Sequence, residues 1–572
     1  MGTAQYDLIS IAANDLSRIK LPQFQRKLVW SKNKKDRFIE TLHEGLPFGS
    51  ILVYPENQNP DARLLIIDGQ QRLSTIREFS KNRIKFWKPL NQTEYDASLN
   101  RINRLLDPNA QIDSRSFDEL LSADEDIQFD WVNEIEGSET RKAVRNELEH
   151  IKRCMRDYID LTHLSIPAIK FIGERTRIAD VFSRLNQGGV ALSKYEVFSA
   201  AWIHTEIKLD QSPLQCEMLA NVKDYYASMS DHAVFDLDGF SEDELTQNRV
   251  VTLAELAIAL GMYVKSHLKA LAPQTDNKVV ELGFGLLGVA ADLDNRKLNQ
   301  LIDHSKAIQT NLETILDKTE RICTNLQDTF AKILKVVKSN KNDEYAQGIS
   351  TSFKTLSYFA ALWNLDPESN SYRNSLRNIK AYYLYDALTG AWGSAGDQRL
   401  LEYQDAHRKR DYLSPITQED FIAAFNQWIS SITPGGIYFS KETKAIITIH
   451  ANLSYLATAV PNGENFELEH IIARKFFNDT ERDVQKKLCG NSLGNCMFLP
   501  KGLNNQKKIK TLYEVNEDER YSKLIQESFY FEERDLLDAI EAIKRGDTEQ
   551  ANRIIRSRAS LIGAATAKAL LS

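Results

Sequence analysis

Short apolar runs typical of buried strands lie toward the two ends of this chain, and helical periodicity fills the region between them. Near the N-terminus three such runs are bounded by Pro, Gly or Asp: Ile51–Tyr54, Leu64–Asp68 and Ser165–Phe171. The more polar segment Asn91–Asp160 interrupts them and is predicted to be a helical insertion. We therefore expect an α/β domain over residues 1–205.

Residues 206–438 carry apolar side chains at three-to-four spacing with few prolines, which indicates amphipathic helices. The clearest segments are Val250–Lys265, Leu298–Leu316, Glu320–Val337 and Ser375–Thr389. A helical pattern carries no chemistry of its own, so this region is interpreted as a helical spacer.

Residues 439–572 return to β-like runs, around Asn465–Ile472 and Leu493–Leu499. Two amphipathic segments follow, Leu536–Lys544 and Ala551–Ala567, and we expect them to pack around the core of a third domain. The predicted fold class is thus α+β and predominantly helical, with three domains.

Composition limits what the chain does as a whole. The net charge of −7 excludes a basic nucleic-acid coat protein, so any contact with DNA would have to come from local patches. The five cysteines form no CxxC pair, which argues against a zinc ribbon and a disulfide framework. The N-terminus lacks a signal-peptide pattern, and no apolar run reaches the roughly 20 residues that span a bilayer. We expect a cytoplasmic protein without membrane contact.

The C-terminal β-like runs contain the parts of a hydrolytic site. Alternation along the first strand separates His470 from Glu467 and Glu469, which share the opposite face. Asn495 and Asn504 follow, the latter in a basic run. Phosphodiester hydrolysis needs a base and a cation, and histidine titrates near the working pH. Carboxylate and amide oxygens are suitable ligands for Mg²⁺ or Mn²⁺.

This segment resembles the HNH nuclease motif, whose fold is a ββα-metal domain. The resemblance implies that His470 is the general base, that Asn495 orients it, and that Lys507 lies near the phosphate. It implies Glu469 and Asn504 as metal ligands, although many family members have Asp at the position of Glu469.

An internal control shows that the tetrapeptide Glu-Leu-Glu-His alone means little. It also occurs at Glu147–His150, in a charged, helix-like stretch without the following asparagines. The surrounding charge does favour phosphate contact, since residues 461–510 contain nine Lys or Arg and six Asp or Glu. A solvated basic face explains that excess almost as well.

A second constellation lies near the N-terminus. The strand-like run Leu64–Ile67 ends at Asp68-Gly69-Gln70-Gln71-Arg72, where a helix-like stretch begins. A strand, a glycine turn and a helix start can present backbone N–H groups to an anion, but an ordinary turn has the same pattern. Two further segments accompany it: Leu21–Arg26, and Phe182–Gly189.

Together these three segments resemble the ParB-like N-terminal domain of GmrSD-type modification-dependent restriction enzymes, whose usual companion is an HNH domain. The resemblance implies an NTPase that binds GTP or ATP, and a nuclease acting on foreign or modified phage DNA. By position, the nucleotide site would comprise Asp68, Gly69, Gln70, Gln71, Arg72, Gln25, Arg26, Asn186, Gly188 and Gly189.

Three functions stay open at the level of the sequence. The leading hypothesis is an NTP-regulated HNH DNA endonuclease. Because one such centre cuts one strand, a double-strand break would need a homodimer or two cleavage events. The second is a nucleotide-sensing DNA-binding protein with a vestigial nuclease, and the third a toxin-like nuclease that attacks host nucleic acid. The sequence does not name the DNA modification, the nucleotide or its effect on cleavage.

Overall fold

The chain is described by a computed structural model that covers residues 6–20, 30, 32–55, 59, 62–123, 125–173, 195, 198, 202, 205–230, 242–273, 275–336, 344–458, 466–516 and 521–572. Two compact units are present: Met1–His204 with Lys223–Arg249, and Thr205–Val222 with Val250–Ser572. The first unit also includes Lys223–Arg249, which belong to the predicted helical spacer. Most of the predicted spacer joins residues 439–572 in the second unit.

The first unit is built on a five-stranded mixed sheet in the order β1-β5-β3-β4-β2. Its strands are β1 (Tyr6–Ala12), β2 (Ile19–Lys20), β3 (Ile51–Pro55), β4 (Leu64–Asp68) and β5 (Ser165–Phe171). β5 is parallel to β3 and antiparallel to β1, whereas β4 is antiparallel to β3 and parallel to β2. Because β3 and β4 are central and buried, their sequences are nearly continuous apolar runs, and the three predicted strands are confirmed.

Sequence alternation did not identify the edge strand β1. Ile11 of this strand is buried, but Leu8 is 77% exposed, so its apolar residues do not share one buried face. Helices α1 (Lys32–His43) and α2 (Gln70–Lys81) belong to the same unit and contact each other.

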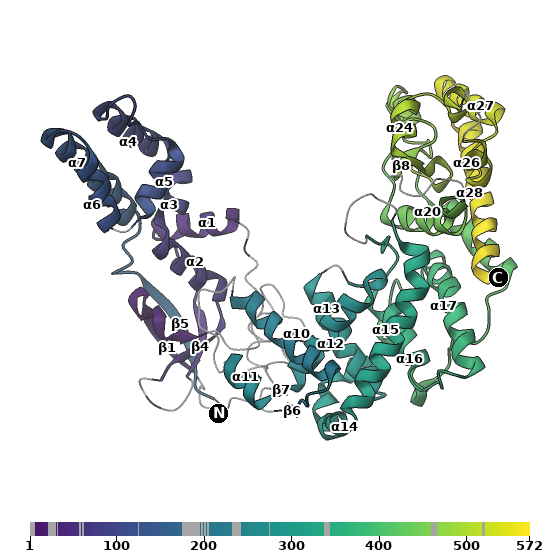
Figure 1. Ribbon diagram of the computed structural model, residues 1–572, viewed down its shortest axis with the longest axis horizontal. Helices are drawn as coiled ribbons and strands as arrows, with labels where there is room; N and C mark the ends of the chain where they lie inside the picture. The colour runs from purple at the N-terminus through teal and green to yellow at the C-terminus, as the bar shows by residue number, and fades with distance from the viewer. Residues whose placement is uncertain are drawn as a thin grey trace. The chain divides into compact units, whose positions relative to one another are not determined.

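The predicted helical insertion between β4 and β5 is confirmed (Figure 1). It follows α2 and comprises α3 (Arg83–Leu90), α4 (Gln92–Leu105), α5 (Ser114–Ser122), α6 (Glu125–Glu134) and α7 (Ser138–Tyr158). These helices enclose a hydrophobic core of their own that includes Trp87, Tyr95, Phe117 and Ile151. The tetrapeptide Glu147–His150 lies in α7, with His150 exposed, as the sequence predicts.

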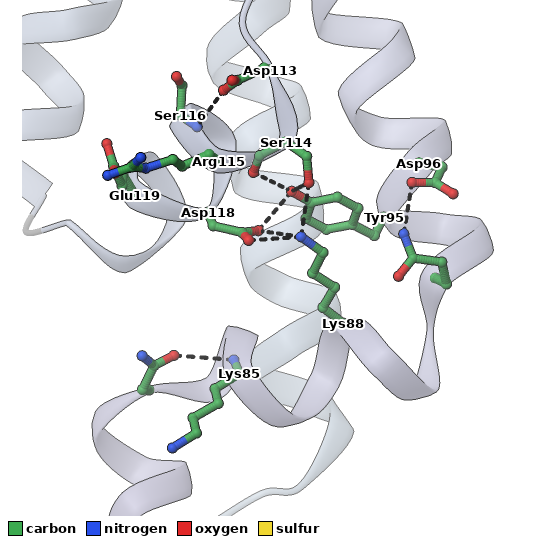
Figure 2. Close-up of polar contacts among 12 residues, drawn as sticks. Lys85, Lys88, Tyr95, Asp96, Asp113, Ser114, Arg115, Ser116, Asp118 and Glu119 are labelled. Carbon is green, nitrogen blue, oxygen red and sulfur yellow. Dashed lines mark hydrogen bonds and ion pairs between the residues drawn. The ribbon is translucent and has the colours of Figure 1, made fainter. Parts of the chain in front are cut away.

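A polar corner joins three helices of the insertion (Figure 2). The Lys88 amino group of α3 donates to Asp118 Oδ2 at 2.7 Å and to Ser114 Oγ at 2.9 Å, both on α5. Tyr95 of α4 donates to Asp118 Oδ1 at 2.7 Å. Partial burial disfavours the charged form of Lys88, but the hydrogen bond to Asp118 outweighs this effect, so the pKa of Lys88 is raised. This corner therefore fixes the relative positions of α3, α4 and α5.

The second unit is mainly helical. After β6 (Glu206–Lys208) and β7 (Val250–Thr252), which pair with each other, its longer helices are α12 (Leu253–His267), α13 (Asp276–Ala290), α15 (Leu312–Leu334), α16 (Ser352–Leu362), α17 (Asn370–Leu388) and α19 (Gln418–Ser431). The helix α10 (Pro213–Ser230) crosses the boundary of the two units, and α11 (Glu242–Asn248) belongs to the first.

Two predicted helices of this region differ from the structure. The segment predicted as Val250–Lys265 begins as strand β7, because a capping box starts the helix only at Leu253: Thr252 Oγ1 accepts the Glu255 N–H, and Glu255 accepts the Thr252 N–H. The segment Leu298–Leu316 is divided into a 3₁₀ stretch (Asn295–His304), α14 (Ser305–Thr310) and the start of α15.

The C-terminal part of this unit packs two strands among helices α20 (Lys441–Leu453), α27 (Glu533–Arg545) and α28 (Thr548–Leu571), seen in green to yellow in Figure 1. The two predicted amphipathic segments are thus confirmed as α27 and α28. Shorter helices complete it: α21 (Tyr455–Thr458), α22 (Arg474–Asn478), α23 (Arg482–Gln485), α25 (Leu512–Val515) and α26 (Ser522–Glu527). The short helix α18 (Gly396–Leu401) instead contacts α16. In the described part of the chain, no helix has the length and apolar character needed to cross a membrane.

Candidate functional site

The candidate hydrolytic site is a strand–strand–helix element. β8 (Phe466–His470) and β9 (Cys496–Pro500) pair in antiparallel register, with His470 opposite Cys496, and α24 (Lys501–Lys507) follows β9 directly. β9 is buried along its whole length, in contact with α20, while α24 contacts both strands. This order of elements places His470 and the residues of α24 at one site.

The His470 ring is held on both its edge and its face. Its Nε2 lies 2.6 Å from the carbonyl oxygen of Ile437, and the ring stacks on Phe439 with centroids 4.0 Å apart. A carbonyl group only accepts hydrogen bonds, so Nε2 carries the proton of the neutral ring and Nδ1 can accept one. Burial lowers the pKa of His470 to about 4, and nearby Arg474 and Lys507 act in the same direction. The ring is therefore neutral at neutral pH, as a proton acceptor must be.

Asn495 is fully buried and acts on the backbone that follows His470. Its Oδ1 accepts the Ile472 N–H at 2.8 Å, and its Nδ2 donates to the Gly490 carbonyl at 3.0 Å. Its own carbonyl accepts the Ile471 N–H at 3.0 Å. These bonds tie Asn495 to the backbone that directly follows His470 at the end of β8.

Lys507 lies inside the element, which differs from the expectation that it approaches a phosphate. Its side chain is completely buried, and its amino group donates to the His470 carbonyl oxygen at 3.1 Å. Glu469 Oε1 is 4.0 Å away. Burial lowers the pKa of Lys507, and the charge of Glu469 opposes that effect. Helix periodicity explains the position, because Leu503 and Lys507, one turn apart, are the two buried residues of α24.

The candidate cation ligands come from facing elements. Glu469 of β8 is partly buried, and burial raises the pKa of its carboxyl group against the opposing effects of Lys507, Arg474 and the Asn504 amide. Asn504 of α24 donates from Nδ2 to Glu467 Oε2 at 3.1 Å. Across the described ranges, no group of three or more His, Cys, Asp or Glu side chains could hold a metal ion. The carboxylate and amide oxygens of Glu469 and Asn504 nevertheless suit a hard cation that keeps several water ligands.

A buried arginine holds the second strand of the site in place. Arg558 of α28 is 1% exposed and donates to the carbonyl oxygens of Gly494 at 2.9 Å and Cys496 at 3.0 Å. It also donates to the Ser528 and Phe529 carbonyls. Burial lowers its pKa to about 10, so it stays charged. Gly494 permits this contact, since a Cβ there would lie 1.8 Å from the Ile555 carbonyl oxygen.

Sequence reasoning placed Glu467 on the face of Glu469 but gave it no role. It missed Ile437, Phe439 and Arg558 as neighbours of the site. Arg558 could have been recognised from the sequence, because it occupies the apolar stripe of α28 between Ile555 and Ile562. Ile437 and Phe439 carry no comparable pattern.

The N-terminal constellation forms the predicted strand–glycine–helix turn. β4 ends at Asp68, Gly69 adopts φ +96°, and α2 begins at Gln70. A side chain at Gly69 would be strained by this φ, and its Cβ would lie 2.4 Å from Ile51 Cγ2. The glycine therefore lets β4 turn sharply into α2 beside β3.

Arg72 is engaged with the protein backbone. It donates to the Ser50 carbonyl at 2.7 Å, and its second terminal nitrogen lies 3.5 Å from Asp68 Oδ2. Gln70 and Gln71 are buried, and Gln71 Oε1 accepts the Trp30 N–H at 3.0 Å. These contacts gather Asp68, Gln71 and Arg72 around the start of α2. Gln25, Arg26, Asn186, Gly188 and Gly189 lie outside the described residues.

The first unit is thus an α/β domain with a glycine turn at the start of a helix, and the second carries a histidine-centred strand–strand–helix site. Residues 7–203 match the family GmrSD restriction endonuclease, N-terminal domain. The match supports the resemblance to that restriction-system nuclease family for the N-terminal part of the chain. It ends before β8 and so does not extend to His470.

One relative among curated proteins is an uncharacterized protein of Methanocaldococcus jannaschii. It is 22% identical over 295 residues, which cover 43% of this chain and 47% of that protein. The chain therefore spans less than half the length of this relative, whose description states no activity.

Proposed function

We propose that the chain is a divalent-metal-dependent DNA endonuclease of the HNH class that acts in a restriction system. The observation that carries the proposal is the arrangement at the end of β8. His470 has its Nε2 committed to a backbone carbonyl and its Nδ1 able to accept a proton, with Glu469 beside it and Asn504 on the facing helix. The match of residues 7–203 to the N-terminal domain of a restriction endonuclease supports the same class.

Each residue has a distinct part in the proposed hydrolysis. His470 Nδ1 accepts the proton of the attacking water, while the bond from Nε2 to Ile437 fixes the ring and its tautomer. Asn495 and Lys507 hold the backbone at His470 from two sides. Glu469 and Asn504 would hold Mg²⁺ or Mn²⁺. When bound, the cation neutralises charge on the scissile phosphate and on the leaving oxygen.

The N-terminal domain is proposed to bind and hydrolyse a nucleoside triphosphate, GTP or ATP, at the start of α2. The glycine turn at Gly69 leads directly into the beginning of a helix, where backbone N–H groups favour phosphate. Asp68, Gln70, Gln71 and Arg72 surround that turn in the sequence, and Gln25, Arg26, Asn186, Gly188 and Gly189 complete the proposed site. The nucleotide would regulate cleavage of foreign or modified phage DNA by the chain or its homodimer in the cytoplasm.

The test is plasmid cleavage with Mg²⁺ or Mn²⁺, on matched unmodified, glucosylated and phosphorothioated DNA, with and without GTP or ATP. His470→Ala should reduce cleavage by about 10²–10⁴-fold without loss of DNA binding. His150→Ala is the matched control, because that histidine follows the same three residues but lies exposed on α7. Cleavage by His470→Ala at the wild-type rate would refute the assignment.

A wild-type chain that binds DNA and nucleotide without cutting would favour the nucleotide-sensing DNA-binding protein. Toxicity to the host lost in His470→Ala, with no preference for modified DNA, would favour the toxin-like nuclease.

A further inference from the structure

A pocket in the second unit lies beside the first turns of α13 and α16. Its volume is about 310 Å³, at the lower end of the range of about 300–1,000 Å³ that is typical of small-molecule sites. Thr275, which precedes α13, and Ser352, the first residue of α16, both line it. Much of the remaining wall is apolar and includes Leu271, Pro273 and Phe353. The pocket therefore has room for a small organic molecule.

The start of α16 offers hydrogen-bond donors to this pocket. The N–H groups of Ser352 and Phe353 lie in the first turn of the helix, where they have no intrahelical acceptor. The side chain of Ser352 is only 8% exposed, and its hydroxyl group makes no hydrogen bond within the described ranges of the chain. Because buried hydroxyl groups normally have a partner, this one indicates that a ligand binds in the pocket.

The charges along the pocket favour an anionic ligand. The positive end of the α16 dipole coincides with the donors of Ser352. On α13, the amino group of Lys278 lies 2.9 Å from each carboxylate oxygen of Glu281. Among the described residues that line the pocket, Glu281 is the one acid, and this ion pair balances its charge. An ammonium group has three N–H donors, so Lys278 keeps at least one for a ligand.

The segment that leads into α16 is held in place from the protein interior. The amino group of Lys354 is buried and donates to the carbonyl oxygens of Ile349 at 2.8 Å and Tyr383 at 3.0 Å. Ser350 Oγ, on the pocket wall, lies 2.8 Å from the Tyr383 hydroxyl group. These bonds order the wall before a ligand arrives, so binding costs little conformational entropy.

We propose that this pocket binds a small phosphate monoester, with its phosphate group at the start of α16 and its organic group against the apolar wall. A phosphate group has three strong acceptor oxygens, which can receive bonds from the α16 backbone, the Ser352 hydroxyl group and Lys278 at once. The pocket shares no residue with the proposed nuclease site or the proposed nucleotide site, so the inference rests on neither activity.

The experiment titrates the full chain with phenyl phosphate, a phosphate monoester with an aromatic group, and follows binding by isothermal titration calorimetry. EDTA in the buffer prevents binding through a divalent cation. Ser352→Ala should weaken binding by about 10-fold or more, because it removes a hydrogen bond to a charged group. Lys278→Met should also weaken it and reduce its dependence on salt. Ser138→Ala is the matched control, since Ser138 is also the first residue of a long helix, α7, but is exposed.

Three results would overturn the inference. They are no saturable binding of phenyl phosphate by the wild-type chain, binding that Ser352→Ala and Lys278→Met leave unchanged, and equal affinity for benzoate, which carries no phosphate. Circular dichroism would verify that each variant is folded.

Competition then identifies the source of the phosphate. Displacement of phenyl phosphate by a 5′-phosphorylated oligonucleotide, but not by its 5′-hydroxyl counterpart, would support the inference with a DNA end as ligand. Displacement by adenosine monophosphate alone would support it with a free nucleotide as ligand.

Discussion

The amino group of Lys507 lies 3.1 Å from the carbonyl oxygen of His470 and 4.0 Å from the carboxylate of Glu469, although its side chain is completely buried. The charged amino group of Lys507 therefore stabilises the end of β8 from inside the strand–strand–helix element. It contacts the backbone of His470 and not the imidazole ring.

Lys507→Met should therefore separate cleavage from DNA affinity. Methionine keeps most of the volume but leaves the His470 carbonyl and Glu469 without this partner, so we expect cleavage to fall by about 10–100-fold. DNA affinity should stay near the wild-type value, because the buried amino group does not contact the backbone of DNA.

The comparison is Lys510→Met, which removes an exposed positive charge from the same basic run. Fluorescence anisotropy at several salt concentrations would measure affinity, and single-turnover cleavage would measure the chemical step. A Lys507→Met variant that binds DNA weakly but cuts bound DNA normally would contradict the internal role.

Two glycines provide a matched test of the packing behind the site. Gly494→Ala would place a Cβ 1.8 Å from the Ile555 carbonyl oxygen, whereas a Cβ at Gly502 on α24 meets nothing within 4 Å. We expect Gly494→Ala to lower the free energy of unfolding of the second unit by about 1–3 kcal/mol, because α28 and its Arg558 must move away. Gly502→Ala should raise it by about 0.5–1 kcal/mol, the usual gain for alanine in a helix. Urea unfolding of both variants would measure these changes, and equal stability of the two would show that the close contact is not required.

The buried side chain of His450 should make the free energy of unfolding depend on pH. It is fully buried in α20, its Nδ1 lies 3.2 Å from Thr566 Oγ1, and burial together with the charge of Arg558 lowers its pKa to about 3. Its usual value is 6.5. Between these values the unfolded chain binds one more proton than the folded chain, so stability falls as the pH decreases from 6.5 toward 3, by at most about 1.4 kcal/mol per pH unit.

His450→Leu should remove this contribution and give a flatter acid profile than the wild-type chain. Thr566 keeps a partner in the variant, since its hydroxyl group donates to the Ile562 carbonyl at 2.7 Å. His407→Leu, at an exposed position, is the control. Thermal unfolding between pH 4 and pH 7.5 would measure both, and parallel profiles for His450→Leu and wild type would contradict the prediction.

The sequence predicted those features that depend on local pattern. Buried strands β3, β4 and β5 and helices α27 and α28 follow from apolar periodicity, and the turn at Gly69 follows from the strand–glycine–helix pattern. It did not predict the partners that come from distant segments. Ile437 meets His470 across 33 positions, and Arg558 meets Gly494 across 64. Such contacts depend on how helices pack, and a single sequence contains little information about that packing.

Arg72 provides a test of whether nucleotide and DNA cleavage are coupled. Its bonds to the Ser50 carbonyl and its proximity to Asp68 place a guanidinium group at the start of α2, where the proposed nucleotide site lies. Arg72→Ala should weaken NTP binding by about 10-fold or more, since a hydrogen bond from a charged group contributes about 1.5–3 kcal/mol. Arg63→Ala, at an exposed position just before β4, is the control.

The same Arg72→Ala preparation should also change DNA cleavage, although no residue of the C-terminal site is altered. A nuclease that shares a compartment with host DNA needs restraint, and a nucleotide can supply it only through different affinities for two states of the protein. Such coupling is typically about 5–150-fold. Cleavage should fall if nucleotide licenses the nuclease, and rise if nucleotide restrains it. NTP turnover and plasmid cleavage measured on one preparation, over a range of NTP concentrations, would decide between these signs. Normal cleavage together with abolished nucleotide binding would show that the two sites work independently.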